Sequence, residues 1–151
     1  MPILPTSTLT QVGRRTPPAL RRAVLALATA VCGLTPALAQ VTTGAEQLQR
    51  WQLAAGAPGQ AARGQAFFAL KAPGGDLSCA SCHGMPPTTS ARHASTGKAV
   101  EPLAPAFNPQ RFTDTAKVDK WFRRNCKDVF SRECSAAEKA DVMAYLLSLK
   151  R

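Results

Sequence analysis

The five residues Cys79-Ala80-Ser81-Cys82-His83 constrain this chain more than any other part of its sequence. In a helix, residues i, i+3 and i+4 share one face, so two thiols and one imidazole would point the same way. Cys-x-x-Cys-His is the attachment pattern of a c-type haem: the thiols add to two porphyrin vinyl groups, and the imidazole reaches the iron. Gly84 then lets the chain turn away from the ring. The pattern predicts one covalent haem c held by Cys79, Cys82 and His83.

Three other structures could use these cysteines. A thioredoxin-like dithiol needs a preceding strand and a βαβ context, which the sequence lacks. A zinc site would need two more ligands, and the seven residues between Cys126 and Cys134 are a poor spacing for a zinc knuckle. A disulfide between Cys79 and Cys82 would leave His83 without a role. Haem attachment is the interpretation that gives each of these residues a function.

The first 39 residues have the composition of an export signal. They contain four arginines and no acidic residue, followed by an apolar run from Ala23 to Leu34. This run has the length of a signal-peptide core and is too short to span a bilayer, although a permanent N-terminal anchor is a less favoured alternative. Ala37-Leu38-Ala39 matches a cleavage site. We expect residues 1–39 to be removed on export to the periplasm, leaving residues 40–151 as one monohaem cytochrome c domain.

The expected mature chain is moderately basic. The full chain has a net charge of +10, but four of its arginines lie in the predicted signal. A positive charge favours encounter with an acidic redox partner, whereas scattered basic residues outside the cytoplasm argue against a nucleic acid partner. One segment is richer in cations, and it is either a solvated helix face or a guide for such an encounter. Its basic residues are Lys117, Lys120, Arg123, Arg124 and Lys127.

The apolar spacing predicts an all-α fold without convincing strands. After a mobile start over residues 40–60, the predicted helices cover residues 61–70, 114–125 and 136–149. A capping box, Ser135 to Glu138, opens the last of them. Residues 86–112 are rich in Pro, Thr, Gly and Ser, which predicts a long loop. In a compact domain such a loop is typical only beside a large ligand, so we expect it to wrap over the haem edge.

The order of these elements resembles the class I cytochrome c fold. In that family a first helix, which carries a glycine and an aromatic residue, crosses a last helix with a Tyr-Leu-Leu-like sequence. Gly64 with Phe67 or Phe68, and Tyr145-Leu146-Leu147, stand at the matching places. The resemblance covers nearly all of residues 40–151 and implies the class I cytochrome c fold.

The residues alone leave the second axial ligand of the iron open. An electron-carrying class I cytochrome c has a methionine in the loop before the last helix, but residues 125–134 contain neither Met nor His. Met143 lies within the last predicted helix, where a methionine is more often a packing residue. His93 lies in the long loop; imidazole does suit iron, but a lone loop histidine is more often a hydrogen-bonding group. Asn125 stands at a predicted helix end, where Asn is a common capping residue.

Longer segments of the chain resemble the sphaeroides haem protein family, which are class I cytochromes whose oxidised iron is bound by a His and an Asn. These segments are residues 93–98, 102–105, 108–112, 117–126, 133–134 and 145–149. The most specific is Trp121-Phe122-Arg123-Arg124-Asn125-Cys126. The resemblance implies that His83 is the proximal ligand, that Asn125 is the distal ligand, and that Cys126 and Cys134 form a disulfide.

The same resemblance implies partners and further contacts. In that family the Asn leaves on reduction, which opens the iron to oxygen or nitric oxide. A dihaem cytochrome c as electron donor and a membrane cytochrome b are the expected partners. Lys98 or Arg111 would pair with a haem propionate, and a carbonyl of Pro102 or Pro105 would accept the Nδ1 proton of His83.

The expected function is therefore a periplasmic electron-transfer cytochrome that binds a small diatomic ligand when Asn125 leaves. Whether it turns over as an oxidase or reductase of a small acceptor is left open. One alternative is a plain six-coordinate electron shuttle with Met143 or His93 as ligand, which would not bind carbon monoxide when reduced. The other is a gas carrier or sensor without turnover.

Overall fold

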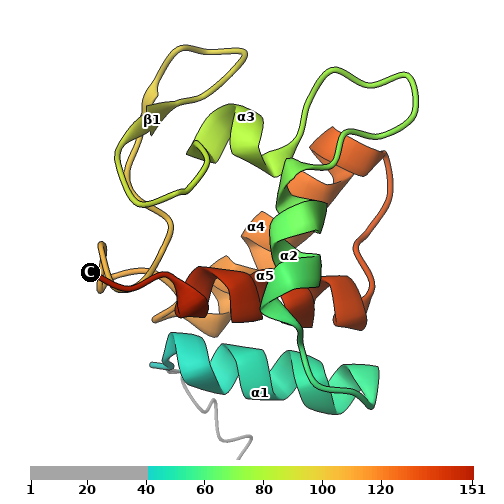
Figure 1. The fold of residues 1–151 in the computed structure, drawn as a ribbon, viewed down its shortest axis with the longest axis vertical. Coiled ribbons are helices and arrows are strands. Elements are labelled where there is room, and N and C mark those ends of the chain that lie inside the picture. The colour runs from blue at the N-terminus through green and yellow to red at the C-terminus, as the bar shows by residue number, and fades with distance from the viewer. Residues whose placement is uncertain (1–40) are drawn as a thin grey trace, which may run out of the picture. The chain divides into compact units, whose positions relative to one another are not determined.

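The computed structural model describes residues 41–151; the predicted export signal lies outside the described residues. The helices of this part are α1 (Gly44–Ala55), α2 (Ala61–Ala69), α3 (Cys79–His83), α4 (Thr115–Phe130) and α5 (Ala136–Ser148), and the strands are β1 (Ala91–Arg92) and β2 (Ala99–Val100). The all-α fold class is confirmed, apart from this two-stranded sheet (Figure 1). None of the described helices is long and apolar enough to span a bilayer.

Helices α2 and α5 cross at a glycine (Figure 1). Gly64 is buried there, and a Cβ atom at this position would collide with the carbonyl oxygen of Asp141 and stand 2.9 Å from the Cβ of Tyr145. Arg63 fastens the same crossing, because its Nε and Nη2 atoms donate to the Asp141 carboxylate at 2.7 and 2.8 Å. The expected crossing of a glycine-bearing helix with the last helix is thereby confirmed.

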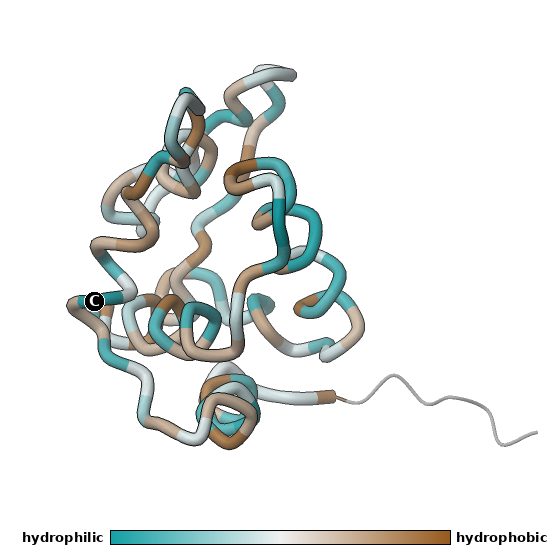
Figure 2. The backbone as a smooth tube through the Cα atoms, turned by 90° about the vertical axis from the view of Figure 1, so that its right-hand side faces the viewer, coloured by the Kyte–Doolittle hydropathy of each residue, from teal (hydrophilic) through white to brown (hydrophobic). Residues whose placement is uncertain are grey.

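The apolar core lies around this crossing. Its buried cluster consists of Phe68, Val142, Tyr145 and Leu146. Partly buried apolar residues that pack against the cluster are Phe67, Cys79, Ala80, Leu103, Phe112, Phe122 and Leu149. The Phe68 ring centroid lies 6.3 Å from that of His83 and 5.7 Å from that of Tyr145. Figure 2 shows apolar and polar stretches alternating along the helical coils, as expected where one helix face is buried.

Helix α1 is the largest difference from the sequence-based expectation. The expected mobile start over residues 40–60 is wrong, because a capping box starts a helix inside it. The Thr43 side chain accepts from the Glu46 backbone N–H at 3.2 Å, and the Glu46 carboxylate accepts from the Thr43 N–H at 2.7 Å. Gly56 ends the helix in the left-handed conformation, with φ of 65°. The Thr-x-x-Glu spacing is the sequence signal that identifies this helix.

A buried polar network ties α1 to α4. The Gln47 side chain, 1% exposed, donates to Thr115 Oγ1 at 2.9 Å and accepts from Arg50 Nη2 at 2.6 Å. Arg50 also forms an ion pair with Asp119 at 2.6 Å. Buried amides need such partners, since leaving one unpaired costs about 1–3 kcal/mol. The network therefore holds the N-terminal half of α4 in place.

Helix α4 continues beyond its predicted end. The prediction stopped it at Asn125, but the helix runs to Phe130 and ends where Ser131 adopts a left-handed conformation with φ of 57°. The extra turn is supported by a tertiary contact, because the Phe130 ring stacks on Phe67 with centroids 4.8 Å apart. Asn125 is therefore a residue within the helix and not its cap, which corrects one reading of its role.

The long loop over residues 86–112 contains a small hairpin that the sequence analysis did not predict. Ala91 pairs with Val100 and Arg92 with Ala99 in antiparallel register. Paired segments of two residues are too short to show an alternating apolar pattern, so no strand could be predicted there. The backbone N–H of Ala94, in the hairpin turn, donates to Cys82 Sγ at 3.3 Å. This contact places the hairpin against the Cys-x-x-Cys-His segment.

Candidate haem site

The candidate site is built on the short helix α3, which comprises the whole Cys-x-x-Cys-His segment. Ser78 starts the helix, and its backbone N–H donates to Ser81 Oγ at 3.0 Å. Gly84 ends it with φ of 76°, a conformation that favours glycine. The helical spacing predicted for the two thiols and the imidazole is therefore present.

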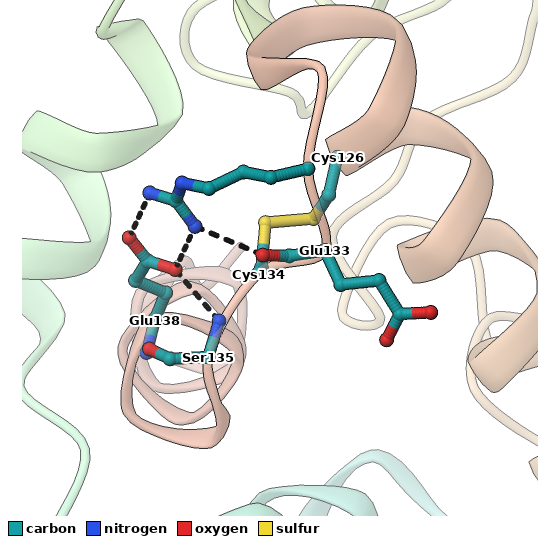
Figure 3. The surroundings of a disulfide bond; sticks show 6 residues. Cys126, Glu133, Cys134, Ser135 and Glu138 are labelled. Carbon is teal, nitrogen blue, oxygen red and sulfur yellow. Dashed lines mark hydrogen bonds and ion pairs between the residues drawn. A yellow bond between two sulfur atoms is a disulfide. The ribbon is translucent and has the colours of Figure 1, made fainter.

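The cysteines of the described part fall into two pairs. Cys126 and Cys134 form a disulfide across Cα atoms 5.6 Å apart (Figure 3), whereas Cys79 and Cys82 are free and half-buried. The disulfide removes two of the ligands that a four-cysteine zinc site would need. No cluster of three or more His, Cys, Asp or Glu side chains suited to a metal ion occurs among residues 41–151. Two free thiols on one helical turn beside an imidazole are the donor set that fits a covalent haem.

Burial sets the protonation of this donor set. Burial raises the pKa of the Cys79 thiol to about 11, so the thiol is neutral at physiological pH. Burial, and then the charges of Arg111 and His93, lower the pKa of His83 to about 4. The His83 imidazole is therefore neutral at physiological pH, which is the form that binds metal ions.

Neither of the carbonyls expected to accept from His83, those of Pro102 and Pro105, forms that hydrogen bond. The Nδ1 atom of His83 is buried and has no hydrogen-bond partner among residues 41–151. The Pro102 carbonyl accepts instead from Arg111 Nε at 2.9 Å, and the Glu101 carbonyl accepts from Arg111 Nη2 at 2.8 Å. A charged guanidinium is a stronger donor than a neutral imidazole, which accounts for this pairing.

The two residues expected to pair with a propionate lie in different surroundings. Arg111 is half-buried and close enough to His83 for its charge to affect the pKa of the imidazole. Lys98 is exposed at the end of the hairpin turn, where its carbonyl accepts from the His93 backbone N–H at 2.8 Å. Propionate pairing by either residue stays a prediction.

Asn125 lies on the inward side of α4. It is half-buried and stands three and seven residues after Phe122 and Val118, a spacing that places all three on one helix face. Val118 is buried, and Phe122 packs against the core cluster that Cys79 also contacts. Within residues 41–151 the Asn125 amide forms no hydrogen bond to another residue, so it is uncommitted.

The alternative ligand candidates have structural roles that Asn125 lacks. Met143 is 0% exposed and packs inside the core as a residue of α5. His93 uses its Nδ1 atom to accept the backbone N–H groups of Ser95 and Thr96, each at 3.3 Å. These contacts account for both residues without an iron ligand role.

The disulfide holds the residue next to Asn125 to the start of α5. Beside it, the Arg132 guanidinium donates to both carboxylate oxygens of Glu138 at 2.7 and 2.8 Å, and the Ser135 N–H donates to the same carboxylate at 2.7 Å (Figure 3). This segment closes a short loop between the two helices. We infer that it restricts the movement of the end of α4 that carries Asn125.

Replacing Cys126 and Cys134 together with alanine is expected to lower the free energy of unfolding by about 2–3 kcal/mol, because the unfolded chain regains loop freedom. Urea unfolding of the holoprotein, followed by haem absorbance and circular dichroism, measures this change. Arg132→Gln is the matched control: it breaks an exposed ion pair of the same segment and is expected to cost no more than about 1 kcal/mol. Equal midpoints for the double variant and the wild type would contradict the expectation.

Comparisons with known proteins show the family to which this chain belongs. A family model described as a domain of unknown function, DUF1924, matches residues 54–146. Over 114 residues the chain is 46% identical to the cytochrome c-type protein SHP of Cereibacter sphaeroides, a match that covers 74% of this chain and 88% of that protein. The chain belongs to the SHP family of c-type cytochromes. The resemblance to the sphaeroides haem proteins is thereby confirmed, and membership implies covalently bound haem c.

Solved structures of related proteins share the fold of this SHP-family chain. The structure of oxidised SHP, described as an oxygen-binding cytochrome c, matches with a TM-score of 0.67 and 43% identity over 72% of this chain and 99% of that one. Oxidised cytochrome c'' of Methylophilus methylotrophus matches with a TM-score of 0.65 and 33% identity over 72% of this chain and 95% of that one. A solution structure of the same cytochrome c'', described as giving insight into haem-ligand detachment, has a TM-score of 0.63, 35% identity and coverage of 72% and 94%.

Proposed function

We propose that this SHP-family protein is an exported monohaem cytochrome c that releases its own distal ligand on reduction and then binds a small molecule such as oxygen or nitric oxide. Cys79 and Cys82 would hold the porphyrin through thioethers, and His83 and Asn125 would be the ligands of the iron. The haem supplies a one-electron couple and one exchangeable coordination position. The uncommitted amide of Asn125 on the inward face of α4 carries this proposal.

The electrostatics of an amide ligand explain why reduction would release it. A neutral amide oxygen is a weak ligand, and its attraction to the iron depends on the iron's positive charge. Reduction would lower that charge by one unit, so the attraction on the Asn125 amide would weaken and the side chain would be free to leave. The Arg50–Asp119 ion pair and the disulfide at Cys126 keep α4 close enough for the amide to rebind on oxidation.

Related proteins support both halves of this proposal. SHP is described as an oxygen-binding cytochrome c, and cytochrome c'' is described in terms of haem-ligand detachment. Export to the periplasm fits a covalent haem, which is normally attached after translocation. A dihaem cytochrome c and a membrane cytochrome b, expected from the family resemblance, are the proposed redox partners. Steady electron flux to oxygen would distinguish a terminal oxidase from a carrier or sensor.

Substitutions of Asn125 test the ligand exchange. Asn125→Ala is expected to convert the oxidised haem fully from low spin to high spin, because the only proposed distal ligand is gone. The reduced variant should still bind carbon monoxide, since the amide has already left in that state. Asn125→His should give low-spin haem in both states and oppose carbon monoxide binding, because imidazole is a stronger ligand for iron than an amide. Visible absorption and electron paramagnetic resonance measure these changes.

Asn108 provides the matched control. It is the other asparagine of the chain and donates to the exposed carboxylate of Glu101 at 3.1 Å. Asn108→Ala should leave the oxidised and reduced spectra as in the wild type. An oxidised spectrum that stays low-spin in Asn125→Ala would exclude Asn125 as the ligand and transfer the role to Met143 or His93.

A further inference from the structure

An exposed tryptophan stands out on the surface of α4. Trp121 is 49% exposed, and its ring is flanked by Lys120 Nζ at 5.7 Å and by the Arg124 guanidinium at 5.6 Å from the ring centroid. A single exposed apolar side chain is ordinary in itself. Trp and Arg, however, are the residue types that most often carry the binding energy of protein interfaces. A tryptophan held between two cations has the composition of an interface centre.

The cations around Trp121 lie on one side of the helix. Lys117, Lys120, Arg124 and Lys127 are all exposed and follow one another at intervals of three and four residues. Lys120 and Lys127 form no ion pair within residues 41–151. Lys117 pairs with Asp114 at 3.6 Å and Arg124 pairs with Asp128 at 3.8 Å, and both of these long ion pairs are exposed. The positive charge of this side is therefore largely uncompensated and available to an acidic partner.

Arg123 lies at the border of this side, away from Trp121, and its side chain lines a pocket instead. It lines a polar cavity of about 260 Å³ together with Trp51, Asp119, Glu133 and Lys139. Helical spacing places Arg123 about 160° around the helix axis from Trp121, although Lys120 and Lys127 lie within about 60° of it. Arg123 and Lys139 thus form a second pair of cations, directed to a different part of the molecule.

The basic side borders on the proposed distal ligand. Trp121 and Asn125 are four residues apart, so they are neighbours on adjacent turns of α4. Phe122, next to Trp121, packs against the same core cluster as Cys79. A protein seated on Trp121 would therefore lie one helical turn from the ligand of the iron, which is a short path for an electron.

We propose that the face formed by Lys117, Lys120, Trp121, Arg124 and Lys127, the α4 basic face, is the docking surface for an acidic electron-donating protein. The cations steer the encounter, and the Trp121 ring is the anchor of the complex. One electron leaves the reduced partner and reduces the oxidised haem iron, so the partner is oxidised by one electron. The proposal rests on the proposed function, because a haem that opens on reduction needs an electron donor.

The rate at which an acidic flavodoxin, in its hydroquinone form, reduces the holoprotein tests this surface. Flavodoxin serves as a negatively charged electron-donating protein. Lys120→Gln with Arg124→Gln is expected to lower the second-order rate constant about tenfold at low ionic strength and to flatten its salt dependence. The matched control is Arg123→Gln with Lys139→Gln, which removes the same two charges from the cavity side. This control should retain most of the wild-type rate. Equal slowing by both pairs would mean that net charge alone matters and would overturn the proposal.

A second variant tests the anchor. Trp121→Ala is expected to raise the apparent dissociation constant of the flavodoxin complex about tenfold while the salt dependence persists, as for an interface hot spot. Reduction by the neutral deazariboflavin radical, which needs no protein docking, should proceed at the wild-type rate in every variant. An unchanged dissociation constant would overturn the role of Trp121.

The spectra of the same variants separate this proposal from the proposed function. Each should show the wild-type low-spin oxidised form and bind carbon monoxide when reduced, because none removes Asn125. If the variants kept the wild-type spectra but the two double variants were reduced at the same rate, the docking surface alone would be rejected. A rate difference in a protein whose Asn125→Ala variant stays low-spin would support the surface and reject the ligand exchange.

Discussion

Alanine at both Cys79 and Cys82 is expected to abolish covalent haem attachment and, with it, the folded holoprotein. The apolar side chains packed around the core cluster include Leu103 and Phe112 of the long loop, which would lose a large apolar partner. Each buried side chain of this size contributes about 1.5–3 kcal/mol, so losing several removes much of a net stability of about 5–15 kcal/mol. Haem staining after denaturing electrophoresis and far-ultraviolet circular dichroism measure both losses.

Two further variants make this result specific to the attachment site. Cys82→Ala alone should retain one thioether and shift the pyridine haemochrome band, since one vinyl group stays unsaturated. Alanine at both Cys126 and Cys134 should retain covalent haem, because that pair forms the disulfide. Haem that survives denaturing electrophoresis in the Cys79 and Cys82 double variant would contradict the assignment.

Features that depend on neighbouring residues were accessible from the sequence. The helical Cys-x-x-Cys-His segment and the capping box from Ser135 to Glu138 both appear in the structure. Each is fixed by hydrogen bonds within about four residues, so its signal is contained in a short stretch of sequence. Helix α1 has the same kind of signal, a capping box at Thr43 and Glu46, in a segment that was expected to be mobile.

Features that depend on distant residues were not accessible. The last turn of α4 is supported by Phe67, more than sixty residues before Phe130. Arg111 donates to the carbonyl of Pro102, one of the two proline carbonyls expected to accept from His83. The place of Asn125 is a third case: its spacing allowed a helix cap, but the residue lies within α4. Tertiary packing decides such positions, and local propensity does not.

Helix α4 attaches to α1 on one side and carries the residues of both proposals on its other sides. Asp119 and the polar network behind it attach the helix to α1. The inward side carries Asn125 among apolar residues, and the outward side carries Trp121 among cations. Attachment at one end by an ion pair and at the other by the disulfide keeps these sides in fixed orientation. Electron entry at Trp121 and ligand release at Asn125 would then occur on adjacent turns of α4.

The contact between α2 and α5 predicts a large loss of stability from a single methyl group. In Gly64→Ala the new Cβ would collide with the backbone carbonyl of Asp141 and with the Cβ atom of Tyr145. Neither atom can move away by a side-chain rotation. Separation of the two helices would also stretch the Arg63–Asp141 ion pair. We expect a loss of about 3 kcal/mol in the free energy of unfolding, even though alanine favours helix over glycine by about 1 kcal/mol.

Gly44→Ala separates crowding at the crossing from the general effect of replacing a helical glycine. Gly44 begins α1, and its new Cβ would meet only the flexible end of Leu147, at 3.0 Å from Cδ2. Leu147 can change rotamer, so this variant should unfold within about 1 kcal/mol of the wild type. Denaturant unfolding of both holoproteins, followed by haem absorbance, gives the comparison. If Gly64→Ala were as stable as Gly44→Ala, the close approach of α2 and α5 would not restrict the residue at position 64. The crossing, which also orients Phe68 toward His83, would then be able to adjust.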